Sequence, residues 1–304
     1  MQYSGKLSID DVKTLTLIIV SANLKVENVS RSDLYYCVTL DGENPKYKPD
    51  IKKFNGNLEI KFQKRNFNMS LINFIDGFKC SNVNEVYVEI PKKKTLDLDI
   101  KTVNGDVILR NLEINSLGFS GVSGDLRLEE ASVADKANLS IVSGDIISSG
   151  LISRNITVRS VSGDGEFSNI GESIEQITIS TVSGNITLGF EKNKPIDVTV
   201  NSASGKVKSN IPLRSLKKGK FTNFDPKDSP DDVAIVEVKS VSGNLCLNFG
   251  NEKTKNSRNF YVSMEDEVQR VIRMIENGVL RKEEGIEILK TIGYTEDEIR
   301  RVIK

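Results

Sequence analysis

Apolar and polar residues alternate along most of the first 249 positions, in short runs separated by polar turns. An apolar residue at every second position lines one face of a β-strand. In the first third of the chain the pattern predicts strands at residues 15–20, 24–29, 34–40, 58–62 and 86–90. These runs share no clear repeat, so residues 1–95 are predicted to form irregular β rungs or a cap.

A tetrapeptide related to Val-Ser-Gly-Asp recurs through residues 96–249. Its glycines are Gly105, Gly124, Gly144, Gly163, Gly184, Gly205 and Gly243. They are 19, 20, 19, 21, 21 and 38 residues apart, so a period near 20 organises this part of the chain. The long last gap contains three prolines and the basic residues Lys217, Lys218 and Lys220, which predicts a loop at residues 209–231 inserted in one degenerate repeat.

Apolar residues lie at fixed distances from each glycine: seven, five and two positions before it, and often two and four after it. Before Gly105 these are Leu98, Ile100 and Val103. All three positions, including the Val of the tetrapeptide, are predicted to face the core. Glycine allows a positive φ at a corner, and the Asp or Asn after it can bind nearby backbone. Each repeat is therefore predicted to be two short strands around a corner.

Two arrangements of these repeats are possible. Equivalent strands can stack in rungs, with ladders of Val and Ile inside, as in a β-solenoid. Alternatively, each Ser-Gly-Asp can be the turn of an antiparallel hairpin. The whole rung pattern repeats, not only the turn, which favours a mainly β fold built as a β-solenoid with rungs of about 20 residues.

The pattern changes after Phe249. Residues 250–259 are polar and predict a linker, and residues 260–304 predict a small α-helical module. Its first helix carries Val268, Val271, Ile272 and Ile275 at helical spacing and ends at Asn277-Gly278; the second carries Ile286, Ile288 and Leu289; the third begins with the capping pair Thr295 and Glu298.

Such a short module buries too little surface to be stable alone, so its apolar faces are predicted to contact a partner. That partner is the β domain, a second copy, a separate protein or a membrane surface. The residues expected to make the contact are Ile272, Ile275, Ile286 and Leu289.

Composition excludes several classes of chemistry. The 304 residues include no His, which excludes Ser-His and Cys-His nucleophile pairs and His-ligated zinc. The 42 Lys and Arg balance the 42 Asp and Glu, so no net positive field attracts nucleic acid. Cys37, Cys80 and Cys246 have neither metal-ligand spacing nor the even number of a disulfide framework.

The best candidate for chemistry is the row formed by Asp106, Asp125, Asp145 and Asp164. Stacked rungs place them about 4.8 Å apart. At that spacing the carboxylates repel, and either a cation such as Ca²⁺ or outward splaying relieves the repulsion. Asn185, Lys206 and Asn244 replace the Asp in later copies, which favours a role in the turn itself.

An enzyme remains the alternative, because polysaccharide lyases and hydrolases also use β-helices and need convergent carboxylates. Glu129-Glu130 and Asp231-Asp232 are adjacent pairs that do not predict convergence, and no phosphate-binding glycine motif is present. We therefore expect no catalytic residues and no cofactor.

Three features together resemble the bacterial DUF4097 family, which carries the label "putative adhesin". They are Val-Tyr-Val-Glu-Ile-Pro-Lys at residues 86–92, Leu-Asp-Leu at 96–98, and the serial Val-Ser-Gly-Asp turns. The resemblance spans residues 12–249 and implies a right-handed β-helix-like domain tied to cell-envelope stress or surface interaction. Residues 264–289 are similar to the SHOCT-like helical modules that accompany this family.

The sequence predicts a cytoplasmic protein or one peripheral to the cell envelope. Asp10 and Asp11 precede the apolar run at residues 15–20, which argues against a secretory signal. No stretch reaches the roughly 18 apolar residues of a membrane span. The predicted function is that of a non-enzymatic, adhesin-like scaffold with a helical partner-binding tail.

Overall fold

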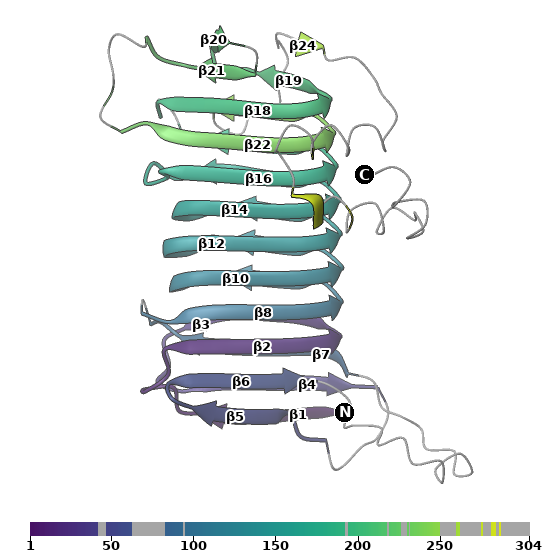
Figure 1. Ribbon diagram of the computed structural model, residues 1–304. Coiled ribbons are helices and arrows are strands. Elements are labelled where there is room, and N and C mark those ends of the chain that lie inside the picture. The colour runs from purple at the N-terminus through teal and green to yellow at the C-terminus, as the bar shows by residue number, and fades with distance from the viewer. Residues whose placement is uncertain are drawn as a thin grey trace, which may run out of the picture.

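The computed structural model describes residues 1–41, 47–62, 83–93, 95–191, 194–217, 219–225, 230, 232–249, 260–261, 275, 281–283 and 286. These residues are mainly β and form two sheets of 12 strands each, one behind the other in the view of Figure 1. Among them, helical backbone occurs at Ile275, Lys282, Glu283 and Ile286, positions too scattered to give a helix bounds. The predicted linker lies outside the described residues.

Sheet A has the order β1 (Gln2–Leu7), β4 (Leu34–Leu40), β7 (Val83–Pro91), β3 (Asn23–Val29), β9 (Val107–Arg110), β11 (Leu126–Glu129), β13 (Ile146–Ser149), β15 (Gly165–Ile170), β17 (Ile186–Phe190), β23 (Leu245–Phe249), β19 (Lys206–Ser209) and β24 (Phe260–Tyr261). Sheet B has the order β20 (Arg214–Lys217), β21 (Lys220–Thr222), β18 (Ile196–Ser204), β22 (Ala234–Ser242), β16 (Gln176–Ser183), β14 (Ile152–Ser162), β12 (Ser132–Ser143), β10 (Glu113–Ser123), β8 (Asp97–Asn104), β2 (Thr14–Ser21), β6 (Asn57–Phe62) and β5 (Asp50–Phe54).

Each repeat gives one strand to each sheet. β8 runs along sheet B, the chain turns at Gly105, and β9 continues in sheet A. Successive repeats then pair in parallel, with Leu98 beside Leu117 and Leu117 beside Ala137. The two strands at a Ser-Gly corner lie in different sheets, so the hairpin alternative is wrong for this chain.

The core is a set of aliphatic ladders between the sheets. Leu98 and Ile100 of β8 are buried, as predicted, and so is Thr102. The prediction for the Val of the tetrapeptide is wrong at most copies: Val103 is 51% exposed and Val122 is 49% exposed. Strict alternation explains the difference, because it places the residue three positions before the glycine inside and the residue two before it outside.

The order of strands departs from the order of the chain at both ends. Near the C-terminus β22 lies between β16 and β18, so the last repeat is inserted before the preceding one. Near the N-terminus β2 pairs with β8, and β6 lies outside β2. The predicted loop at residues 209–231 contains the antiparallel hairpin β20–β21, which extends sheet B beyond β18.

Antiparallel strands close both ends of the stack. At the N-terminal end β4 pairs with β7, β1 with β4, and β5 with β6. At the other end β21 pairs with β18, and β24 with β19. A parallel stack would otherwise end in a long strand edge that can pair with another molecule, so these short strands fit the role of caps.

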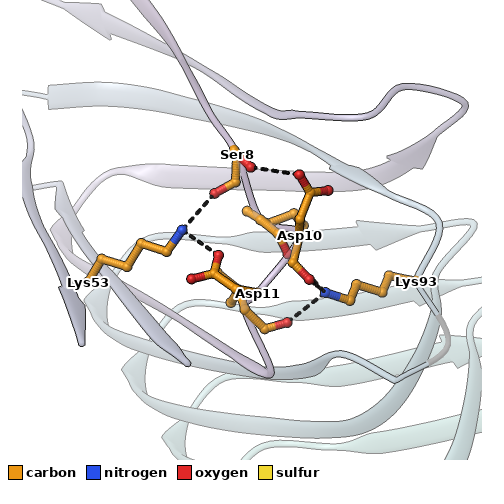
Figure 2. Close-up of polar contacts among 7 residues, drawn as sticks. Ser8, Asp10, Asp11, Lys53 and Lys93 are labelled. Carbon is orange, nitrogen blue, oxygen red and sulfur yellow. Dashed lines mark hydrogen bonds and ion pairs between the residues drawn. The ribbon is translucent and has the colours of Figure 1, made fainter. Parts of the chain in front are cut away.

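At the N-terminal end, where the order of the strands departs from that of the chain, a lysine binds the loop that precedes β2 (Figure 2). The Nζ of Lys93, just before β8, donates hydrogen bonds to the carbonyl oxygens of Ile9, Asp10 and Val12 at 2.9, 2.8 and 2.8 Å. Those carbonyls belong to the loop that leads into β2. One ammonium therefore holds the starts of two neighbouring sheet B strands.

Lys53 of β5 adds a second tie to the same loop (Figure 2). Its Nζ donates to the carbonyl oxygen of Ser8 at 3.3 Å and lies 2.5 Å from Oδ1 of Asp11. The hydrogen bond from Lys53 lowers the pKa of the exposed Asp11 carboxyl below its usual value. The capping strand β5 is thus fastened to the loop that precedes β2.

Lys194 has a position like that of Lys93 at the C-terminal end, where β22 lies between β16 and β18. Its side chain is 5% exposed, and its Nζ donates to the carbonyl oxygen of Glu172 at 2.6 Å and to both carboxylate oxygens of Asp232 at 2.7 Å. Glu172 precedes β16, Lys194 precedes β18 and Asp232 precedes β22. One buried ammonium therefore joins the entries of three consecutive strands of the sheet.

Two further predictions concern cysteine and membrane spans. Cys37 and Cys246 are half-buried thiols, and Cys80 lies outside the described residues. Within the ranges given above, no helix is long and apolar enough to cross a bilayer.

Candidate functional site

The Ser-Gly corner is the most regular feature of the molecule. Its seven glycines have φ between +104° and +148°. A Cβ on Gly144 would lie 2.2 Å from the carbonyl oxygen of Gly124, and a Cβ on Gly163 would lie 2.0 Å from that of Gly144. The corner therefore requires glycine for two reasons, a backbone angle that other residues rarely adopt and close contact with the preceding rung.

The structure brings the four candidate aspartates together in one row along this corner. Oδ1 of Asp106 accepts the backbone N–H of Asp125 at 2.9 Å, Oδ1 of Asp125 accepts that of Asp145 at 2.9 Å, and Oδ1 of Asp145 accepts that of Asp164 at 2.8 Å. Oδ1 of Asp164 accepts the N–H of Asn185 at 2.6 Å. Each side chain thus bonds the backbone of the next rung.

The same row extends beyond the aspartates. Oδ1 of Asn185 accepts the N–H of Asn244 at 3.2 Å, and Oδ1 of Asn244 accepts that of Lys206 at 3.0 Å. Lys206 is the last member of this row, and a lysine stands there in place of Asp or Asn. The order Asn185, Asn244, Lys206 also shows that the repeat with Asn244 lies between the two repeats that precede it in the chain.

The sequence analysis missed the first member of the row. Asp106 donates its backbone N–H to Oδ1 of Asn23 at 2.9 Å. Residues 20–23 read Val-Ser-Ala-Asn, a copy of the tetrapeptide with Ala22 in place of glycine. That signal was present in the sequence, but the alanine and the distance from Gly105 concealed it.

The row explains the acidic residues without a cation, because one oxygen of each carboxylate accepts a backbone hydrogen bond. Among the residues that the structure describes, no group of three or more Cys, Asp, Glu or His side chains could hold a metal ion. The turn-stabilising interpretation of Asp106, Asp125, Asp145 and Asp164 therefore accounts for the observed geometry.

A charged cluster lies on the outer face of sheet A, where Glu27 of β3 and Glu89 of β7 are cross-strand partners. Lys25 lies 3.2 Å from Glu27, and Arg31 lies 2.5 Å from Glu89. A hydrogen bond from Tyr87 lowers the pKa of Glu27, with Lys25 acting in the same direction, and burial raises the pKa of Tyr87. The cluster is ion-paired, and Glu27 is not suited to be a general acid.

The acidic pairs singled out in the sequence do not converge. Glu129 ends β11 and pairs with Arg110 at 2.6 Å, whereas Glu130 turns the chain at a second corner with a φ of 53°. Asp232 binds Lys194, and Asp231 lies outside the described residues. Neither pair has the geometry of two opposed carboxylates across a groove.

An apolar cavity of about 270 Å³ lies at the C-terminal end of the core. Its apolar lining includes Val200, Val207, Phe221, Val238 and Leu245. Thr181, Ser202 and Ser240 also line it, and each of their hydroxyls donates a hydrogen bond to the backbone carbonyl oxygen two positions further on. The lining is thus chiefly aliphatic, and these hydroxyls are not presented to a polar ligand.

The predicted partner-binding residues are described only in part. Ile275 and Ile286 have helical backbone and are half-buried, whereas Arg281, Lys282 and Glu283 are exposed. Ile272 and Leu289 lie outside the described residues.

The repeated corner, the parallel ladders and the two sheets define a β-repeat protein. Its chain belongs to the Toastrack DUF4097 family, whose model matches residues 12–135 and 101–248. The family expected from the resemblance is therefore confirmed. The search of curated proteins gave no match.

Solved structures similar to this chain include a "putative cell adhesion protein" from Clostridium sporogenes, with 11% identity, coverage of 82% of this chain and 99% of that chain, and a TM-score of 0.38. A "putative adhesin" from Bacteroides fragilis has 13% identity, 81% and 97% coverage, and a TM-score of 0.43. A "putative lipid binding protein" from Parabacteroides distasonis has 14% identity, 80% and 96% coverage, and a TM-score of 0.35.

Proposed function

We propose that this protein is a non-enzymatic, adhesin-like binding protein that acts at the bacterial cell envelope. In this proposal the two sheets are the walls of a β-solenoid, and their outer faces bind an envelope component. Residues 260–304 form a SHOCT-like helical module that binds a protein partner through Ile272, Ile275, Ile286 and Leu289.

The observation that carries the proposal is the regularity of the outer face of sheet B. Parallel pairing places one outward side chain of every rung in the same row, as in the row Lys101, Ser120, Ser140, Arg159, Ser180 and Lys239. Neighbouring members are about 4.8 Å apart. A flat face with such rows suits many weak, repeated contacts with an extended polymer or surface, as adhesion requires.

The burial of the tail residues supports the second part of the proposal. Ile275 and Ile286 belong to the apolar faces predicted from the sequence, and both are half-buried, whereas Arg281, Lys282 and Glu283 are exposed. Amphipathic helices that each cover one face show this distribution. The tail is therefore suited to pack against a protein surface.

The test is cosedimentation of the purified full chain with isolated bacterial cell walls and with phosphatidylglycerol vesicles. Binding to at least one of them is expected, and a chain that ends at Tyr261 is expected to bind equally well because it keeps both sheets. Only the full chain is expected to retain a protein from an envelope extract of the native cell. Sugar release is measured in parallel.

Failure of both chains to sediment would contradict the proposal. Release of sugar fragments from the walls would also contradict the proposal, because it would support the alternative, a carbohydrate-active enzyme. Phosphatidylcholine vesicles are the control, because they offer a membrane without the anionic headgroup.

A further inference from the structure

The apolar cavity lies between the two sheets at the end of the stack that carries β18 and β21, at the top of Figure 1. Three neighbouring strands of sheet A, β17, β23 and β19, contribute to its lining, and β16, β22, β18 and β21 contribute from sheet B. Neighbouring strands are about 4.8 Å apart, so the cavity extends over about 10 Å along the stack. Its long direction follows the stack of rungs.

The rung formed by β18 and β19 is more open than the rung beside it. Val238 and Leu245, which face the core in β22 and β23, are 2% and 3% exposed. Their register partners are Val200 in β18 and Val207 in β19, and both of these are half-buried. Residues of the same character at the same register therefore reach solvent only in this rung, and the cavity opens there.

The residue at the register of Val200 is also small. Following the parallel pairing along sheet B, the same position is occupied by Phe119 in β10, Leu139 in β12 and Ile179 in β16. All three are buried. A Val at this position fills less of the space between the sheets, and protein interiors rarely leave a void of about 270 Å³.

The opposite end of the stack is closed by aromatic rings. Phe62 of β6 and Tyr36 of β4 pack edge to face with their ring centroids 5.9 Å apart, and Phe62 is 1% exposed. The cavity is therefore a property of the C-terminal end, and it does not follow simply from the fact that a stack of rungs must end.

The shape and lining of the cavity select an apolar, extended ligand. An apolar cavity of about 150 Å³ is large enough to bind benzene and remains free of water when it is empty. This one is larger, its long direction crosses three rungs, and Val200, Val207 and Phe221 line it. An unbranched hydrocarbon chain has both the length and the chemistry for such a space.

A cation lies at the same site. Of the described residues that line the cavity, Lys206 is the charged one, and it is exposed. Its backbone N–H donates to Oδ1 of Asn244 at 3.0 Å, which fixes the start of its side chain at the corner. An ammonium group binds a carboxylate or a phosphate through charge-assisted hydrogen bonds. The chain inside the cavity is therefore matched to an anionic head outside it.

We propose that this cavity binds a single-chain anionic amphiphile of the fatty-acid type. The hydrocarbon chain lies between the sheets against Val200, Val207 and Phe221, and the carboxylate or phosphate head lies beside Lys206. This goes beyond binding by the outer faces of the sheets, because the ligand is one small molecule and its chain is enclosed.

The test is isothermal titration calorimetry of the purified full chain with three ten-carbon amphiphiles, each below its micelle concentration: decanoate, decyl phosphate and decyltrimethylammonium. One anionic molecule is expected to bind per chain, with a negative heat-capacity change because apolar surface is buried. Decyltrimethylammonium is expected to bind at least ~10-fold more weakly, because Lys206 repels its head. The tighter of the two anionic probes identifies the head, that of a fatty acid or that of a phospholipid.

Val200→Phe places in the cavity the ring that β10 carries at the same register. It is expected to weaken decanoate binding at least ~10-fold, and its thermal midpoint should equal or exceed that of the native chain, because the ring fills existing space. Thr199→Phe is the matched control, since it adds a ring to the neighbouring residue, on the opposite face of β18. It should bind decanoate as the native chain does.

Lys206→Gln tests the head independently of the core, because the residue is exposed. It should weaken the binding of both anionic probes and leave that of decyltrimethylammonium no weaker than before.

Absence of binding by both anionic probes would overturn the inference. So would native affinity in a folded Val200→Phe, because the ligand would then lie elsewhere, and so would equal affinity for the anionic and cationic probes. Val200→Phe changes no side chain on an outer face, so it is expected to sediment with cell walls as the native chain does. Failure of this inference is therefore distinguishable from failure of the proposed function.

Discussion

The glycine of each corner is the residue on which the repeat depends most. Gly144 combines a φ of +131° with a hypothetical Cβ position 2.2 Å from the backbone of Gly124. Gly150, at the second corner, has a φ of +73°, and its Cβ would meet nothing closer than 3.7 Å. The two glycines therefore differ in how strongly each excludes a side chain.

Gly144→Ala is expected to lower the free energy of unfolding by about 3 kcal/mol or more, because it adds a clash with backbone to an unfavourable φ. Gly150→Ala, the matched control, should cost only about 1 kcal/mol, the strain of a left-handed alanine. Urea unfolding followed by circular dichroism measures both. Equal losses at the two sites would show that the contact between rungs has no part in the requirement for glycine.

The tetrapeptide also shows where residue patterns mislead. Its glycine and aspartate were assigned correctly to a corner, because both have local backbone reasons to be there. Its valine was assigned to the core on hydrophobicity alone, although alternation from Leu98 and Ile100 leads to Thr102 and leaves Val103 outside. The period of two predicted the buried face correctly. The valine that departs from this period lies on the outer surface of the sheet.

At the scale of the element, the corner row couples neighbouring rungs by one hydrogen bond per repeat. The acceptor is always a side-chain oxygen and the donor a backbone N–H, so Asp and Asn are interchangeable there. This explains why the row continues from Asp164 to Asn185 with the same kind of bond, a side-chain oxygen accepting a backbone N–H, at 2.6 and 3.2 Å.

Asp145→Ala is expected to lower the free energy of unfolding by about 1 kcal/mol, because the N–H of Asp164 loses its acceptor. Asp145→Asn keeps Oδ1 and should leave the stability close to that of the native chain. The midpoints of urea unfolding compare them. A loss of stability in the Asn variant as large as in the Ala variant would mean that the charge, and not the hydrogen bond, matters at this corner.

Strands and corners could be predicted from the sequence, whereas the strand order at the ends could not. The runs around Leu15, Leu58 and Val198 show the same alternation as any central strand, so nothing local distinguishes an exchanged rung from one in sequence. The 38-residue gap before Gly243 was visible, but a loop and a capping hairpin both fit it. Placing β22 between β16 and β18 needs long-range pairing, which the pattern does not encode.

At the scale of the whole molecule, one lysine at each end of the stack binds the loops that lead into neighbouring strands. At both ends the order of the strands differs from the order of the chain. Lys194 is the more buried of the two, and its partner Asp232 is largely exposed, with side chains 5% and 74% exposed. Removing Asp232 and removing Lys194 are therefore expected to change the free energy of unfolding by different amounts. A buried ammonium without its carboxylate is costly, whereas an exposed carboxylate without its lysine is simply hydrated.

Asp232→Ala is expected to cost about 2 kcal/mol of unfolding free energy, and Lys194→Met about 1 kcal/mol or less. The double variant should resemble Lys194→Met, since no buried charge remains in it. Urea unfolding measures the three stabilities, and hydrogen exchange of β22 locates the effect. A greater loss for Lys194→Met than for Asp232→Ala would contradict this account.

The exchanged order of strands also constrains how such a chain can change in length during evolution. Between β8 and β17 the order of the chain equals the order of the stack, so a duplicated repeat of about 20 residues can enter there and still find the same neighbours on both sides. At either end an added repeat would separate partners that are far apart in sequence, such as β16 and β22. Growth of the molecule is therefore confined to its middle, and the two ends are inherited as fixed units.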